Sequence, residues 1–182
     1  MKFTPTPLSG LILIEPDIFR DDRGTFLESY NKDQFLTAGI DVDFIQDNQS
    51  VSKLHVVRGL HFQNPPYAQG KLVRVVKGRV LDVAVDIRPG SATFGRHYSL
   101  ELNSIDQKML WIPPGFAHGF SVLEEDSVFC YKVTTLYSKE HERGIRFDDP
   151  ELNINWRVPN PVVSEKDKIL PTFKEYLHYV HS

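Results

Sequence analysis

The sequence contains a single cysteine, Cys130, among its 182 residues. One cysteine cannot form a disulfide within the chain, and it excludes a metal site built from several thiolates. No apolar run is long enough to cross a membrane, and residues 1–7 contain no apolar stretch of signal-peptide length. These absences predict a cytoplasmic protein that has no membrane partner.

Charge of one sign is not concentrated anywhere in the chain. The 21 basic and 24 acidic residues leave a net charge of −3, without a long run of either sign. This balance argues against a general nucleic-acid-binding protein, although a local basic cluster can still hold a small anion. The chain is 41% apolar and 12% aromatic, which is enough to bury a core, and its length predicts one domain over residues 1–182.

Apolar residues mostly recur with a period of two. Residues 80–87 alternate in this way, and a glycine turn at 77–79 separates them from the apolar run 72–76, which predicts two adjacent strands. Further strands are expected at residues 11–15, 26–30, 44–52, 58–63, 98–102, 108–112, 118–122 and 127–134. Many short strands separated by proline, glycine, asparagine and aspartate predict an all-β sandwich or barrel.

Helices are expected only at the periphery. Residues 31–38 predict a short helix that ends before Gly39. Ser164 to Asp167 has the form of an N-terminal capping box, and four apolar residues then follow with helical spacing. These four are Phe173, Tyr176, Leu177 and Val180. We therefore expect a helical C-terminal segment.

Four side chains in the middle of the sequence suggest a reaction. They are His61, Lys71, His118 and Tyr131. A base, a cation and a phenolic acid are the groups needed to remove a proton from carbon and to return it. Most of them lie in or beside valine-rich segments predicted as strands, so that a β-structure can hold them together. We interpret the chain as an enzyme.

Five motifs, in matched order, resemble a known family. They are R-G-L-H-F-Q (58–63), Q-G-K-L-V-R-V (69–75), G-R-V-L-D-V-A-V-D-I-R (78–88), I-P-P-G-F-A-H-G-F (112–120) and S-E-K-D (164–167). With the D-R-G at 22–24, they resemble the dTDP-4-dehydrorhamnose 3,5-epimerase family over nearly the whole chain. The resemblance implies a cupin-type jelly-roll barrel with short peripheral helices, a homodimer, and no cofactor. One departure is the segment 92–97, where Ala92 and His97 replace an expected proline and aromatic residue, which leaves details of the sugar pocket open.

The resemblance also implies an activity and a set of residues. The substrate would be dTDP-4-dehydro-6-deoxy-D-glucose, inverted at C3 and C5 through an enolate. His61 would be the base, oriented by Asp167. Lys71 would stabilise the enolate oxygen, and Tyr131 would return a proton from the opposite face. Substrate would be bound by Arg23, Glu28, Gln46, Asn48, Arg58, Lys71, His118, Tyr137, Glu142 and Lys166.

Several of these residues also have a purely structural interpretation. Tyr131 taken alone is more often a packing aromatic, and Asp167 is equally well explained as the last residue of a helix capping box. Without the family match, Arg23 would be read as a turn residue and Glu142 as a solvated charge. Lys71 differs, because burying an unpaired ammonium group is costly.

A bound metal is not expected. Residues 113–118 match the second motif of metal-binding cupins, but the first motif needs a His-x-His pair and a glutamate before a glycine. Here the pair is replaced by His61-Phe62-Gln63, and Lys71 stands where the glutamate would be. A fixed ammonium repels a divalent ion, and two histidines are too few ligands.

Two alternatives to double epimerisation remain open from the sequence. One is an epimerase that inverts only C3 or only C5 in another dTDP-deoxysugar pathway. The other is a non-catalytic cupin that binds a nucleotide sugar. The set of His61, Lys71, Tyr131 and Asp167 favours an enzyme, because a binding protein does not need a base opposite an acid.

Overall fold

This computed structural model describes residues 1–180 of the chain, and side-chain surroundings up to residue 178. The strands are β1 (Lys2–Pro5), β2 (Ile12–Glu15), β3 (Ile18–Asp21), β4 (Gly24–Leu27), β5 (Gln46–Ser52), β6 (Val57–Gln63), β7 (Lys71–Lys77), β8 (Arg79–Asp86), β9 (His97–Asn103), β10 (Met109–Ile112), β11 (Phe116–Val122), β12 (Ser127–Val133) and β13 (Glu142–Gly144). The helices are α1 (Lys32–Thr37), α2 (Glu165–Lys168) and α3 (Phe173–Val180). In this part of the chain, no helix has the length and apolarity needed to cross a membrane.

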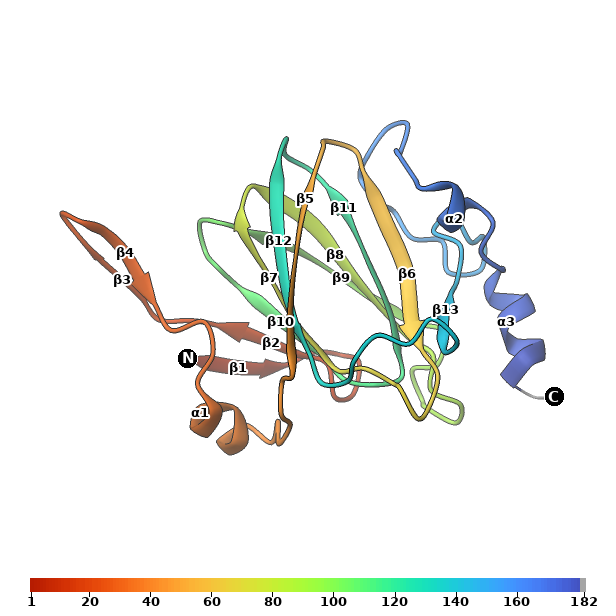
Figure 1. Cartoon of the computed structure of the whole chain (residues 1–182), viewed down its shortest axis with the longest axis horizontal. Coiled ribbons are helices and arrows are strands. Elements are labelled where there is room, and N and C mark those ends of the chain that lie inside the picture. Colours follow the sequence, from red (N-terminus) through yellow and green to blue (C-terminus); the bar gives the residue numbers. More distant parts are fainter. Residues whose placement is uncertain (181–182) are drawn as a thin grey trace.

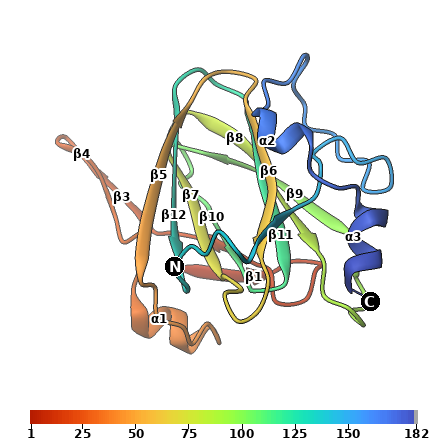
Figure 2. The same cartoon turned by 45° about the vertical axis from the view of Figure 1, so that its right-hand side comes forward.

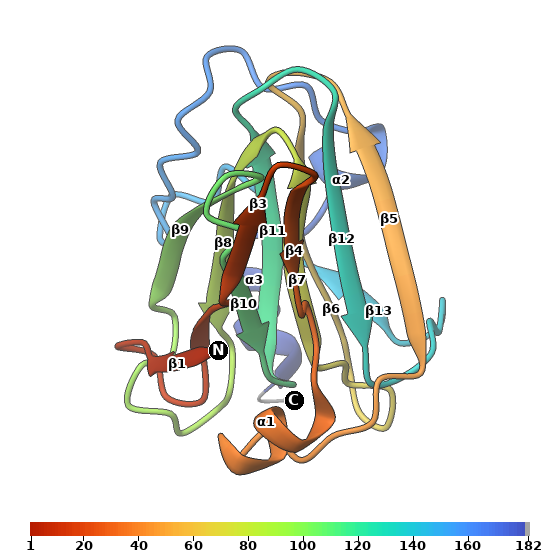
Figure 3. The same cartoon turned by 90° about the vertical axis from the view of Figure 1, so that its left-hand side faces the viewer.

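Two sheets face each other and form a flattened barrel (Figure 1). One has the strand order β1-β2-β10-β7-β12-β5 and the other β13-β6-β11-β8-β9. Neighbouring strands come from distant parts of the sequence and run antiparallel, as in a jelly roll. In Figure 3, α1 and the β3–β4 hairpin lie on the near side of the barrel, and α2 and α3 lie behind it. The predicted all-β jelly-roll barrel with peripheral helices is confirmed.

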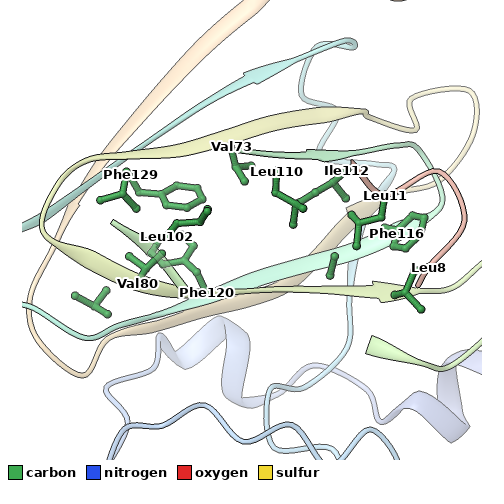
Figure 4. Packing of buried hydrophobic residues seen from close by; sticks show 13 residues of the cluster. Leu8, Leu11, Val73, Val80, Leu102, Leu110, Ile112, Phe116, Phe120 and Phe129 are labelled. Carbon is green, nitrogen blue, oxygen red and sulfur yellow. The ribbon is translucent and has the colours of Figure 1, made fainter. Parts of the chain in front are cut away.

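Apolar side chains fill the space between the sheets (Figure 4). β8 is buried on both faces, because Val80 and Ala84 point into the barrel whereas Val83 packs outward near Trp156 of the C-terminal segment. Asp82 lies in phase with Val80 and Ala84 and is fully buried. The alternation of β8 therefore places the Asp82 carboxylate in the barrel interior.

The predicted helices are present. α1 begins after Asn31, whose side chain accepts a hydrogen bond from the Gln34 N–H at 3.2 Å, and buries Phe35 against the outer face of the six-stranded sheet. α3 packs Phe173 and Tyr176 against the outside of the other sheet. The side chain of Val180, which completed the predicted helical pattern, lies outside the described residues.

The N-terminal strands were predicted less well. The strand expected at residues 26–30 is wrong in its bounds: β4 ends at Leu27, because the Glu28 carboxylate accepts hydrogen bonds from Asn31 and Gln34 at the start of α1. Strands β1, β3 and β13 were not anticipated. β3 and β4 form a hairpin that projects from the barrel (Figure 1), so it has no buried face to produce an alternating pattern.

Candidate active site

A cavity of about 580 Å³ lies between the two sheets and reaches α2. Strands β6 and β11 form one wall, and β5, β7 and β12 form the other. Figure 2 shows α2 beside β6, at the edge of this space. The predicted site residues that line the cavity are Asn48, Arg58, His61, Lys71, His118, Tyr131, Lys166 and Asp167.

His61 on β6 pairs with Asp167 on α2. The His61 Nε2 lies 2.7 Å from the Asp167 Oδ1, and the Gly59 N–H donates to the other carboxylate oxygen at 3.3 Å. Burial opposes ionisation of Asp167, but the hydrogen bond and charge of His61, together with the hydrogen bonds from Gly59 and Ser164, outweigh it and hold the pKa of Asp167 below its ordinary value. An ionised Asp167 can only accept, so the His61 Nε2 carries the proton and Nδ1 is left as the basic nitrogen.

Asp167 also lies in a capping box, and the structure separates its two roles. Its backbone N–H donates to the Ser164 Oγ at 3.1 Å, which caps α2. Its carboxylate points to His61 and is 5% exposed as a side chain. The cap therefore uses the backbone of Asp167 and leaves the side chain free to orient the imidazole.

Two glycines bring β6 and β11 close together beside the histidines. Gly59 has a φ of +122°, which L side chains rarely adopt. A Cβ on Gly59 would lie 2.6 Å from the Gly119 Cα, and a Cβ on Gly119 would lie 2.6 Å from the Arg58 carbonyl oxygen. His61 and His118 are cross-strand partners in the same pair of strands, so this close approach sets their spacing.

Lys71 is the half-buried cation in the wall of the cavity. Burial lowers the pKa of Lys71 to about 8, and the charges of Asp82 and Glu142 oppose that shift. The His118 Nε2 lies 2.7 Å from the Asp82 Oδ1, and both side chains are buried. Burial lowers the pKa of His118, against the influence of Asp82, so that His118 is neutral at pH 7. Lys71 remains the charged donor in this part of the cavity.

Tyr131 stands on the wall opposite His61. It lies on β12 of the six-stranded sheet, paired with Asn48 on one side and Val73 on the other, whereas His61 lies on the five-stranded sheet. Burial raises the pKa of Tyr131, and Arg58 acts weakly in the other direction. The phenol therefore stays protonated at neutral pH and is suited to donate a proton.

Polar residues continue from the cavity toward its mouth. Lys166 donates to the Glu142 carboxylate at 2.6 Å, and the Tyr137 hydroxyl donates to the same oxygen at 2.7 Å. On the other wall, the Gln46 amide donates to the Asn48 side chain at 2.7 Å. Tyr137, Glu142 and Gln46 do not line the cavity themselves. Glu142 and Gln46 are hydrogen-bonded to the lining residues Lys166 and Asn48, and Tyr137 is hydrogen-bonded to Glu142.

Arg23 and Glu28 do not meet the other candidates. Arg23 lies in the turn of the β3–β4 hairpin, where it pairs with Asp21, and its side chain is 90% exposed. Glu28 is held at the start of α1. Neither residue lines the cavity, and the hairpin that carries Arg23 projects from the barrel (Figure 1). That Arg23 and Glu28 bind substrate stays a prediction.

Sequence reasoning missed Asp82 and Ser50. Among the described residues, the Asp82 Oδ2 and the Ser50 Oγ are buried without a hydrogen-bond partner. Ser50 lines the cavity, and Asp82 is hydrogen-bonded to His118, which also lines it. The signal was available in β8, where Asp82 interrupts an apolar face. β5 gives a similar signal, since its inward positions are all polar.

The segment 92–97 lies outside the cavity. Phe94 packs on Phe173 of α3, and Gly95 also contacts that ring. Thr93 donates to the buried carboxylate of Asp86 at 2.6 Å. Neither Ala92 nor His97 lines the cavity.

The metal question can be tested on the same residues. Across residues 1–178, no three histidine, cysteine, aspartate or glutamate side chains are grouped as metal ligands would be. His61 and His118 each direct Nε2 at a carboxylate, and Lys71 lies in the cavity wall beside them. This donor set does not suit a divalent cation.

The cavity can therefore carry out proton transfer at carbon. A ligand between the sheets would meet an oriented imidazole on one wall and a protonated phenol on the other. Lys71 offers a positive charge to an oxyanion formed between them. Arg58 and Lys166 add positive charge where the cavity reaches the surface, which suits a phosphorylated ligand.

Comparisons with known proteins identify the family to which the chain is similar. The family model for dTDP-4-dehydrorhamnose 3,5-epimerase matches residues 5–175. The enzyme of that name from Pseudomonas aeruginosa is 51% identical over 170 residues, which cover 92% of this chain and 93% of the relative. A dTDP-4-dehydrorhamnose 3-epimerase from Streptomyces niveus is 36% identical, covering 92% and 82%. The crystal structure of the Legionella pneumophila 3,5-epimerase, in complex with dTDP-4-keto-L-rhamnose, superposes with a TM-score of 0.91 at 43% identity, covering 95% and 93%.

Proposed function

Because the chain belongs to the dTDP-4-dehydrorhamnose 3,5-epimerase family, we propose that it converts dTDP-4-dehydro-6-deoxy-D-glucose into dTDP-4-dehydro-L-rhamnose by inverting C3 and C5. It is an isomerase of dTDP-rhamnose biosynthesis. The observation that carries the proposal is the His61–Asp167 pair facing Tyr131 across one cavity, with Lys71 in its wall.

The reaction depends on stabilising an enolate. C3 and C5 both flank the C4 carbonyl, so removal of either proton places negative charge on O4. An imidazole is a weaker base than such a carbanion by on the order of ten pK units, or ~14 kcal/mol. The Lys71 ammonium stabilises the charge on O4, and a preorganised cation in a dry cavity is worth roughly several kcal/mol.

The proton steps use opposite walls. His61 removes a proton through Nδ1, with the resulting imidazolium stabilised by Asp167. Tyr131 protonates the same carbon from the other face and becomes a phenolate. His61 then holds one proton too many and Tyr131 one too few, so both exchange with solvent before the second centre reacts. His118 assists at the sugar or at the enolate.

The nucleotide is bound nearer the surface. Arg58 and Lys166 bind the two phosphates, since guanidinium and ammonium groups suit phosphate oxygens. Tyr137, whose ring is largely exposed, stacks on the thymine, and Glu142 holds it in place. Gln46 and Asn48 contribute polar contacts from β5.

Proton NMR of dTDP-4-keto-6-deoxyglucose with the enzyme in heavy water tests the function. Solvent deuterium at both C3 and C5, with formation of the L-rhamno product, is the expected result. Exchange at one carbon only would favour the single-centre epimerase, which the Streptomyces niveus relative represents. Binding without exchange at either carbon would establish the non-catalytic cupin instead.

The pH dependence should report the charge of Lys71. We expect turnover to fall as the pH rises through about 8, because the ammonium that stabilises the enolate is then deprotonated. Asp82→Asn removes a charge that raises the pKa of Lys71, so the fall should move to lower pH. Lys77→Arg, at the exposed far end of β7, is the control. A pH profile that is the same in wild type and Asp82→Asn would assign the fall to another group.

We also propose that the enzyme needs no metal and no organic cofactor. Lys71 and Gln63 stand where metal-binding cupins place ligands, so prolonged chelation followed by assay should leave turnover unchanged. Loss of turnover that returns only when a divalent ion is added would contradict this.

We further propose that the enzyme is a homodimer and that the β3–β4 hairpin of each protomer docks on the other. Phe19 and Phe26 on this hairpin are 62% and 66% exposed, and a two-stranded hairpin is barely stable by itself. In the dimer, the hairpin carries Arg23 to the cavity of the second protomer. We also propose that the enzyme is cytoplasmic, which fractionation of cells would test.

The dimer predicts the effect of removing the hairpin's apolar surface. Phe19→Ser with Phe26→Ser should shift the mass measured by light scattering from dimer to monomer and raise KM. Ile169→Ser, at an even more exposed apolar residue after α2, should change neither. A monomeric wild type would disprove the proposal, as would a double variant that stays dimeric.

A further inference from the structure

Gln63 is a buried polar residue to which the mechanism assigns no part. It ends β6, two positions beyond His61, and is 7% exposed. It does not line the cavity of the catalytic residues. It lines a smaller adjoining cavity of about 290 Å³, together with Phe62, Tyr176 and Lys71, and Lys71 also lines the cavity of the catalytic residues. Any effect of Gln63 on the reaction must therefore pass through other residues.

The Gln63 amide makes three hydrogen bonds, and they join two loops. Its Nε2 donates to the carbonyl oxygens of Tyr67 at 2.7 Å and Leu136 at 3.1 Å. Its Oε1 accepts from the Ser138 N–H at 2.6 Å. One side chain thus fixes the loop after β6 to the peptide groups on both sides of Tyr137.

The peptide that Gln63 holds leads directly to Glu142. The Ser138 carbonyl accepts from the Glu142 N–H at 2.9 Å, and Glu142 is the cross-strand partner of Gln63 itself. The Tyr137 hydroxyl then donates to the Glu142 carboxylate. Gln63 therefore holds the backbone on both sides of Tyr137 and pairs with the strand position of Glu142. The hydrogen bond between Tyr137 and Glu142 then links these two side chains to each other.

Other contacts between the two loops lie on either side of residues 136–138. Beyond them, the Asn64 N–H donates to the His141 carbonyl at 2.9 Å, and the rings of Tyr67 and His141 pack together. The Gly70 N–H donates to the Thr134 Oγ1 at 2.8 Å, and the Thr135 Oγ1 donates to the Ala68 carbonyl at 3.2 Å. These bonds fix residues 134 and 135. Within the described residues, the bonds to Leu136 and to the Ser138 N–H come from Gln63.

Only a primary amide can make this set of bonds. The site needs two donors for two carbonyls and one acceptor for an N–H, which glutamine supplies from a single group. A glutamate would keep the acceptor but place an oxygen against two carbonyl oxygens. A methionine would fill the space and leave all three backbone groups without partners.

From these contacts we propose that Gln63 is a positioning residue that holds Tyr137 and Glu142 in place for the nucleotide sugar. This inference rests on the proposed function, in which Tyr137 stacks on thymine. Gln63 should act on substrate binding and leave the chemical step nearly unchanged, because His61, Lys71 and Tyr131 are held by other contacts.

Gln63→Glu and Gln63→Met, with Gln107→Glu as control, test the proposal. Gln107 makes a comparable bond to a loop carbonyl, that of Ser104, away from the cavity. We expect KM and the Kd for dTDP, measured by calorimetry, to rise roughly ten-fold or more in both Gln63 variants. Their kcat should stay within about two-fold of wild type, and Gln107→Glu should match wild type.

A double-mutant cycle decides whether Gln63 acts through Tyr137. In a Tyr137→Ala background, Gln63→Glu should add little further rise in KM, since the side chain being positioned is absent. Additive effects, an unchanged KM, or a loss confined to kcat would overturn the proposal. So would failure of both Gln63 variants to fold, which would make the role structural. An inactive wild type would refute the proposed function instead. The Kd for dTDP in the Gln63 variants would still show whether Gln63 affects nucleotide binding.

Discussion

Replacing His61 with alanine should abolish solvent exchange at both C3 and C5 of the substrate. His61 is the base for both centres in the proposed mechanism, and general-base catalysis typically contributes ~10²–10⁴-fold. The fold should survive, because the His61 side chain is partly exposed in the cavity and the Asp167 backbone still caps α2. Exchange is measured by proton NMR in heavy water, and dTDP affinity by calorimetry.

Asp167→Asn should lower turnover by a large factor, on the order of 10²–10⁴, with dTDP binding retained. An asparagine can turn its NH₂ group toward the His61 Nε2, which would place the imidazole proton on Nδ1 and remove the base. Asp148→Asn, at an exposed carboxylate paired with Arg146, is the control. Residual exchange at the wild-type rate in folded Asp167→Asn would reduce Asp167 to a helix cap.

The pairing of His61 with Asp167 shows what local sequence cannot decide. The two residues are separated by 106 positions, and the capping box by itself explained the aspartate equally well. The decision came from geometry, since the backbone N–H and the carboxylate of Asp167 point to different partners. A sequence pattern identifies the residue types at such a site, but the chain path between them decides which atoms meet.

The barrel was predictable where each strand has one face turned inward. In β8 both faces are buried, and the apolar residues at 80–87 divide between the barrel interior and the cluster under the C-terminal segment. The roles predicted for Arg23 and Glu28 stay predictions, because neither residue lines the cavity of this chain. Arg23 lies in a projecting hairpin, and the Glu28 side chain is hydrogen-bonded at the start of α1. Asp82 and Gln63 were missed as site residues because their hydrogen bonds cannot be read from the sequence. Asp82 has a buried oxygen without a partner, and Gln63 joins two loops.

Tyr131→Phe separates proton removal from proton return. The substitution keeps the aromatic ring and removes only the hydroxyl, whereas His61, Lys71 and the nucleotide-binding residues stay in place. The enolate should still form. With no acid on the far wall, it should be reprotonated mostly from the His61 side, so that solvent deuterium enters with the original configuration. Net inversion should fall by about 10²–10⁴-fold, and substrate affinity should change little.

The measurement is solvent deuterium incorporation together with product stereochemistry. Tyr98→Phe is a matched control, because Tyr98 packs against the same core without lining the cavity. If Tyr131→Phe, but not Tyr98→Phe, exchanges deuterium without inversion, the phenol is the acid on the far face. A damaged base would have stopped the exchange as well. Undiminished inversion would show that Tyr131 only packs against the core and that another group, such as His118 or water, delivers the proton.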